Sequence, residues 1–371
     1  MKPFFISLGL CLGMVAAITF WADVDHRWHR IPVMPTRGLT TGEVWVWPAI
    51  NWDERTFKIS QLALQKTPDV IVLGNSHAAM ISTDMFPHQT TLFNMSISGA
   101  SLEDLLIMWQ VVKVSNRIPK RIVLEIDPWM LTADITQFQG WRKYSNYLND
   151  FLHFSQQSGI VRPIKLWTTK CRNLFTEMTE LFSWIEFKSV LKYIYGLRKG
   201  FSSKFVGIIL ERNLPGTEQA FHADGSRVYS TLDSSPKDRR ALENIISKKT
   251  LGDDLFYLTP TWSFSPGDDY RLGLLLHEMA IYHVNVLIIL PPLHSLEYNE
   301  LIQRREYKHI FPEFVTHIQR LNKSYPNVHI CNTGNSAWNG CQDIEFYDGS
   351  HMRAPCAAKV VNYCFSKIIH L

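Results

Sequence analysis

The sequence predicts an α/β protein with a three-layer, doubly wound and mainly parallel sheet, a helical insertion and an N-terminal transmembrane helix. Two observations predict this class. Short apolar runs rich in β-branched residues alternate with helical segments, and a long uncharged apolar segment opens the chain. Strands separated by helices pair in parallel, because each parallel connection needs a crossover of a dozen or more residues. The 371 residues, 46% of them hydrophobic, suffice for one large domain or two modest ones.

The opening segment predicts a membrane anchor. The run from Pro3 to Trp21 carries no charge, and nineteen residues at helical rise span about 28 Å, close to the thickness of a bilayer core. Bulky residues close the run where a signal-peptidase site has small ones. We therefore expect an uncleaved signal-anchor at residues 1–22, with a cleaved signal peptide as the alternative.

The orientation of this anchor rests on two signals that disagree. Arg27, Arg30 and Arg37 follow the apolar run and only Lys2 precedes it, so the positive-inside rule places the body in the cytoplasm. A two-residue lead before the run is instead the layout of a signal-anchor, which places the body in the periplasm or outside the cell. We expect the exported orientation.

Charge and cysteine content exclude several classes of protein. The 38 basic residues are interleaved with 34 acidic ones, whereas nucleic-acid binding requires a clustered basic face. His26 and His29 lack further ligands and no CxxC pair occurs, so we expect neither a metal site nor a cofactor. Cys331 and Cys341 flank a short polar loop and are a candidate disulfide in an exported body.

The α/β rhythm begins after a polar and aromatic lead-in at residues 23–66 and occupies residues 67–371. Continuous apolar runs predict strands at residues 69–73, 92–95, 121–126, 284–290 and 328–331. Helical patterns lie between and after them, at residues 101–116, 236–249, 268–283, 300–324 and 357–369.

An insertion at about residues 130–230 interrupts this rhythm with a helical, aromatic pattern that has no clear strands. Leu174, Met178, Leu181 and Ile185 recur at the spacing of one helix face. The insertion is either a cap packed on the main domain or a surface that rests on the membrane or on a membrane partner.

Three short polar segments stand at the carboxyl ends of predicted strands, where ligands bind in such sheets. They are GNSH at residues 74–77, NMSISGAS at residues 94–101 and YDGSH at residues 347–351. A serine hydroxyl needs an adjacent base to become a nucleophile, and Asp348 is placed to orient His351 as the base for Ser76. The backbone N–H groups of Gly99 and Ser76 are candidate donors to an oxyanion.

These three segments resemble blocks one, two and five of the SGNH or GDSL hydrolase superfamily, which has a flavodoxin-like sheet. The resemblance implies that Ser76 is the nucleophile and first oxyanion donor, Gly99 the second donor, Asp348 the orienting acid and His351 the base. The motifs cover about twenty residues, while their order and strand–loop spacing agree over most of the chain from residue 66. The nucleophile elbow of α/β-hydrolases is excluded, because that fold places its acid well upstream of its histidine.

The sequence departs from the family in its third block, whose asparagine donates to the oxyanion. Asp127 falls near that position, and an ionised carboxylate cannot donate a hydrogen bond. The Trp129 indole is one substitute donor. Asn75, His77, Asp127, Trp129 and His294 are the candidate residues of a substrate pocket, with a surface position as the alternative for His294.

The anchor and the altered third block resemble exported SGNH-like proteins that acylate cell-envelope polymers, such as the D-alanyl transfer protein of teichoic acids and the alginate O-acetylation proteins. This resemblance implies a serine acyl-transfer enzyme that uses an acylated small molecule or an envelope polysaccharide. It also implies a multi-pass membrane acyltransferase as partner. The alternatives are a plain carboxylesterase or lipase-like hydrolase, and a degenerate SGNH-like scaffold that binds without chemistry.

Overall fold

The computed structural model describes residues 37–46, 54–87, 89–132, 140–157, 207–214, 220–229 and 262–366, with isolated positions at 13–15, 17, 35, 243 and 246. Within these ranges no helix is long and apolar enough to cross a membrane. The predicted anchor lies almost entirely outside the described residues. So do the predicted helix at 236–249 and the helix face from Leu174 to Ile185.

A parallel five-stranded sheet forms the centre of the α/β fold, with strand order β3-β2-β4-β8-β9. All five predicted strands are confirmed, as β2 (Val70–Leu73), β3 (Leu92–Asn94), β4 (Arg121–Glu125), β8 (Asn285–Leu290) and β9 (Val328–Asn332). The chain runs from β2 outward to β3 and then returns past β2 to β4. The strand order therefore reverses between β2 and β4, and in open α/β sheets ligands bind beyond the carboxyl ends of the strands at such a reversal.

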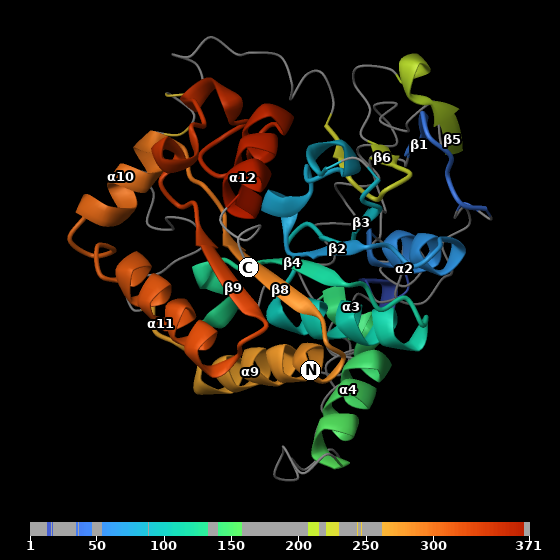
Figure 1. Ribbon diagram of the computed structural model, residues 1–371, viewed down its shortest axis with the longest axis horizontal. Coiled ribbons are helices and arrows are strands. Elements are labelled where there is room, and N and C mark those ends of the chain that lie inside the picture. The colour runs from blue at the N-terminus through green and yellow to red at the C-terminus, as the bar shows by residue number, and fades with distance from the viewer. Residues whose placement is uncertain are drawn as a thin grey trace, which may run out of the picture.

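Each strand is buried on both faces of this sheet. Ile71 and Leu73 of β2 belong to one hydrophobic core, while Val70 and Val72 belong to a second core on the other face. The first face is covered by α3 (Leu102–Val114), α9 (Pro266–Ile281) and α11 (Ile310–Ser324), and the second by α12 (Ala354–Ser366) (Figure 1). The period-two alternation of the strands thus produces two separate cores.

Three predicted helices are confirmed, as α3, α9 and α12, and one is not. Ser101 begins α3 with a capping box, in which its backbone N–H donates to Asp104 at 3.0 Å. The predicted helix at residues 300–324 is wrong, because two helices cover this region, α10 (Ser295–Gln303) and α11. Arg304 ends α10 in an extended conformation with ψ of 124°, which no continuous helix accommodates. A further helix, α4 (Ser145–Gln157), packs on α3.

The lead-in and the end of the insertion combine into a second, antiparallel sheet of order β5-β1-β6-β7. Its strands are β1 (Glu43–Val46), β5 (Gly207–Leu210), β6 (Ala220–His222) and β7 (Arg227–Val228). The expectation of an insertion without strands is therefore wrong at residues 207–228. These strands are short, and β1, which lies between β5 and β6, is supplied from more than 150 residues earlier in the chain.

Helix α2 (Glu54–Leu64) joins the second sheet to the parallel sheet. Phe57 stacks between Trp45 and Phe221, with ring centroids 5.0 and 4.8 Å away. Lys58 is fully buried, and its ammonium group donates to the carbonyl oxygens of Asn94, at 2.8 Å, and of Gly225. One lysine therefore binds the end of β3 and the β6–β7 turn together. Burial lowers the pKa of Lys58 from its ordinary 10.5 to about 7, although the Glu54 and Asp224 charges oppose this shift.

Because Lys58 is buried, we expect the free energy of unfolding to increase with pH. Its pKa is lower in the folded state, so between about pH 7 and pH 10 the unfolded chain binds a proton that the folded chain has released. The free energy of unfolding of the wild type should therefore rise over this window relative to a Lys58→Met variant, by at most about 1.4 kcal/mol per pH unit. Urea denaturation at pH 6, 7.5 and 9 measures the difference, and parallel pH profiles would contradict it.

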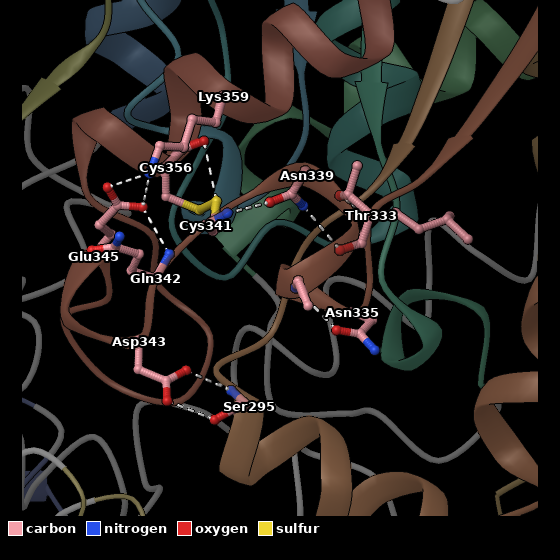
Figure 2. Close-up of a disulfide and its surroundings, with 12 residues drawn as sticks. Ser295, Thr333, Asn335, Asn339, Cys341, Gln342, Asp343, Glu345, Cys356 and Lys359 are labelled. Atoms are coloured by element: carbon pink, nitrogen blue, oxygen red, sulfur yellow. Dashed lines mark hydrogen bonds and ion pairs between the residues drawn. A yellow bond between two sulfur atoms is a disulfide. The ribbon is translucent and has the colours of Figure 1, made fainter.

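Two disulfides fasten the C-terminal segment, and neither is the predicted Cys331–Cys341 pair. Cys331 of β9 bonds to Cys364, and Cys341 bonds to Cys356, so both bridges end on α12. The predicted pair fails because α12 packs over the strand end and places its own cysteines beside each partner. The second bridge closes the loop of residues 341–356, which contains Asp348 and His351 (Figure 2).

Removal of the Cys341–Cys356 bridge by alanine substitution of both cysteines should lower the free energy of unfolding by about 3 kcal/mol. That is the loop-closure entropy of a cross-link between positions 15 residues apart. Removal of Cys331–Cys364, which spans 33 residues, is the matched control and should cost a similar amount. Urea denaturation measures both variants. Unchanged stability of the wild type under a reductant that opens both bridges would contradict the prediction.

Candidate active site

The first predicted segment leaves β2 at the reversal of the strand order. Ser76 begins a short 3₁₀ helix (Ser76–Ala78), and the Asn75 side chain caps it by accepting from the backbone N–H of His77 at 2.8 Å. The backbone N–H of Asn75 donates to Glu125 of β4 at 2.6 Å. A Cβ atom on Gly74 would lie 2.6 Å from the Glu125 carboxylate, so only glycine allows β4 to approach this closely.

The structure brings Ser76, His351 and Asp348 into one series of hydrogen bonds. His351 Nε2 lies 2.8 Å from Ser76 Oγ, although the two residues are 275 positions apart. His351 Nδ1 lies 3.0 Å from both oxygens of Asp348. A donating Nδ1–H leaves Nε2 as the acceptor for the serine hydroxyl, which is the arrangement that activates a serine.

Asp348 is held in its ionised form by its neighbours. Burial alone raises its pKa, but the His351 side chain and the backbone N–H groups of Ser350 and His351 outweigh burial and bring the pKa well below the ordinary range. The two backbone donors lie 3.0 and 2.9 Å from Asp348 Oδ1. The carboxylate is thus fixed in orientation and charge before any substrate arrives.

The second predicted segment places Gly99 in a turn at the end of β3, where its φ is +64°. Glycine adopts this left-handed conformation without strain. Within the described ranges, the backbone N–H groups of Gly99 and Ser76 donate to no protein acceptor. The turn adjoins the Ser76 segment, because the backbone N–H of Ile97 donates to the carbonyl oxygen of Gly74 at 3.0 Å. Two backbone donors of this kind are what an oxyanion requires.

A charged pair from outside the predicted segments holds this turn. Glu54 at the start of α2 accepts hydrogen bonds from the backbone N–H of Ser98 and, at 3.0 Å, from its hydroxyl. Arg227 of β7 donates to the same hydroxyl at 2.6 Å and to Glu54 at 3.4 Å. The second sheet therefore orients the residue that precedes Gly99.

A second buried cluster lies directly behind Ser76. Asp127 accepts hydrogen bonds from the Asn75 amide and, at 2.7 Å, from His77 Nδ1. Burial lowers the pKa of His77, but the charge and hydrogen bond of Asp127, together with the charges of Asp348 and Glu297, outweigh burial and the net pKa is raised. Burial raises the pKa of Glu125 far above the ordinary range, and the Asp127 charge adds to this effect. Burial also acts to raise the pKa of Asp127, yet the charge and hydrogen bond of His77 and the hydrogen bond of Asn75 bring this pKa below its ordinary value.

His77, Glu125 and Asp127 are also the group of described residues with the spacing of metal ligands, since their ligand atoms lie within 4.8 Å of one another. The oxygen of Asp127 nearest to His77 already accepts two hydrogen bonds, and Glu125 Oε2 accepts one from the backbone. A cation would have to displace these donors. The cluster is therefore accounted for by its own hydrogen bonds.

Two other predicted pocket residues lie elsewhere. His294 is fully buried, so a surface position is wrong; it caps α10 by accepting from the backbone N–H of Leu296, and its own N–H donates to Gly349 at 2.9 Å. It thus supports the loop that carries Asp348 and His351. Trp129 lines a pocket of about 280 Å³ on the α3 side, whose other walls are Ser101, Glu103, Met130, Thr132, Ser265, Asp268 and Arg271.

Sequence reasoning missed Glu54, Arg227 and Glu125, together with Tyr229. The Tyr229 ring lies 4.7 Å from that of Tyr347, tilted by 32°, and Arg227 and Arg353 lie over the Tyr229 and Tyr347 rings at 4.8 and 4.5 Å. Tyr347 belongs to the predicted YDGSH segment. The other residues belong to segments whose neighbours are set by tertiary packing, so no local signal marks them.

The sequence matches no protein-family model, and no curated protein matches it.

The Glu54→Ala variant should lower the reactivity of Ser76 toward a fluorophosphonate by about 10- to 100-fold, because loss of the clamp on Ser98 displaces the adjacent donor of Gly99. The rate of labelling of the full chain measures this. Glu43→Ala is the matched control, because Glu43 lies in the same lead-in and, among the described residues, pairs with Arg37 and the adjacent Thr40 turn. Equal losses in both variants would contradict a specific role for Glu54.

Proposed function

We propose that this chain is a serine acyl-transfer enzyme of the SGNH type that works through an acyl-serine intermediate. The series of hydrogen bonds from Ser76 through His351 to Asp348 carries the proposal. The parallel sheet supports it, because its strand order places Ser76 at the edge where such folds bind ligands. The three motifs that meet in this site support the family assignment.

In the proposed reaction Ser76, His351 and Asp348 act one after another. Ser76 Oγ attacks the carbonyl carbon of an ester and passes its proton to His351 Nε2, while Asp348 stabilises the resulting imidazolium. The tetrahedral oxyanion accepts hydrogen bonds from the N–H groups of Ser76 and Gly99. Collapse breaks the bond to the leaving alcohol, which takes the proton from His351. Water or a second hydroxyl then attacks the acyl-serine by the same steps in reverse.

We propose an exported position for this enzyme and an envelope glycan or polymer as its acyl acceptor or donor. Two disulfides support export, because such bonds persist in oxidising compartments. The N-terminal apolar run supports attachment to the membrane, where a multi-pass acyltransferase is the proposed partner. The plain esterase alternative uses the same acyl-enzyme with water as acceptor. The ordered hydrogen bonds of the site favour chemistry over a binding scaffold.

Fluorophosphonate labelling of the full chain in detergent tests the proposal. The probe should attach to Ser76 of the wild type, and Ser76→Ala and His351→Ala should each abolish labelling while thermal unfolding changes little. Ser82→Ala is the matched control, because Ser82 hydrogen-bonds the nearby Asp84 on the surface and should label as the wild type does. Folded wild-type protein that does not label would overturn the proposed chemistry.

A further inference from the structure

We propose that His77 is a second catalytic histidine, an imidazolium held beside Ser76 that stabilises the negative charge of the tetrahedral intermediate. The inference rests on the proposed serine chemistry. It supplies a third donor to the oxyanion, in addition to the N–H groups of Ser76 and Gly99. Asp127 is then a positioning residue, which acts on the reaction only through His77.

The position of the His77 ring carries the argument. His77 follows Ser76 in the same 3₁₀ turn, and its ring lies edge-on to that of His351 with centroids 4.8 Å apart. His351 Nε2 is itself 2.8 Å from Ser76 Oγ, so both imidazoles adjoin the nucleophile. The Nδ1 edge of His77 is bound to Asp127 at 2.7 Å, which directs its Nε2 edge away from that carboxylate.

The charge of the buried cluster follows from its hydrogen bonds. Glu125 Oε2 accepts from the backbone of Asn75, whereas Glu125 Oε1 faces no donor within the described ranges. Burial, with the Asp127 charge beside it, raises the pKa of Glu125 well above its ordinary value, so this carboxyl keeps its proton. Glu125 is then a neutral acid, Asp127 an anion and His77 a cation. A buried anion with a cation and neutral donors around it is the least costly distribution of charge here.

The surroundings of His77 favour its cationic form. Burial opposes a charge on the ring, and the carboxylates of Asp127, Asp348 and Glu297 outweigh this opposition. His351 is the facing group that gains positive charge during the reaction, as Ser76 loses its proton. The negative charge that develops on the substrate at that moment compensates the second cation.

Asp127 thereby resolves the departure at the third block. Its carboxylate cannot donate to an oxyanion, but it holds a neighbouring group that can. One donor of this kind contributes about 10²–10³ to turnover, and a charged donor is stronger than a neutral amide. His77, next to the nucleophile, then donates to the oxyanion, and Asp127, after β4, holds His77 in position and in its cationic form.

The test measures hydrolysis of p-nitrophenyl acetate by the full chain in detergent, from pH 5 to pH 10, with Ser76→Ala as the background. His77→Gln should lower kcat by about 10²–10³ with little change in KM, because the oxyanion exists only after substrate binds. The wild-type rate should also fall on the alkaline side as His77 loses its proton, and His77→Gln should lack that fall. Asp127→Asn keeps the side-chain volume and should shift the fall to lower pH.

His317→Gln is the matched control, because His317 forms a separate histidine–aspartate pair with Asp269 at 2.6 Å. It should keep both the rate and the pH profile of the wild type. A wild-type rate in His77→Gln would overturn the inference alone, and so would a wild-type profile without an alkaline fall, which needs no variant to fold. A wild type no faster than Ser76→Ala would instead overturn the proposed function and this inference with it.

Discussion

Strands β2 and β4 run parallel and side by side, so the segments that follow them leave the sheet at the same edge. Everything at the candidate site depends on this pairing. Because Gly74 has no side chain, the Glu125 carboxylate packs against the backbone at the end of β2. The hydrogen bond from the Asn75 N–H to Glu125 then fixes the position of the Ser76 turn relative to β4. Asp127 then reaches His77 from the next turn of chain. Ser76 is thus held by the strand beside it as well as by its own strand.

The other half of the site comes from the C-terminal loop, which needs separate support because loops carry few internal contacts. The Cys341–Cys356 bridge closes this loop, and the ion pair of Lys359 with Glu345 ties it again to α12 (Figure 2). His294 binds the Gly349 carbonyl from the far side. These restraints hold His351 at hydrogen-bond distance from a serine 275 residues away, without any contribution from substrate.

The second sheet links the lead-in of the chain to the Gly99 turn of the candidate site. Lys58 binds the end of β3, and four residues earlier in the same helix Glu54 binds the turn that leads to Gly99. Both are ionisable groups removed from water, and both form hydrogen bonds with backbone groups of the site. Such groups are costly to bury, and their cost is offset only when every partner is in place. Residues of the lead-in therefore hold the backbone of the site in position.

The parallel sheet could be predicted from the sequence alone, because its strands are short, continuously apolar runs, which are typical of strands buried on both faces. The same holds for Ser76, Asp348 and His351, whose residue types and positions after strands have a direct chemical meaning. The sequence did not identify Glu54, Arg227, Glu125 or the disulfide partners. Their roles arise from contacts between segments far apart in the chain, and no local periodicity records such contacts. Tertiary structure alone decided which charges are buried together, and with them the state of the cluster behind the nucleophile.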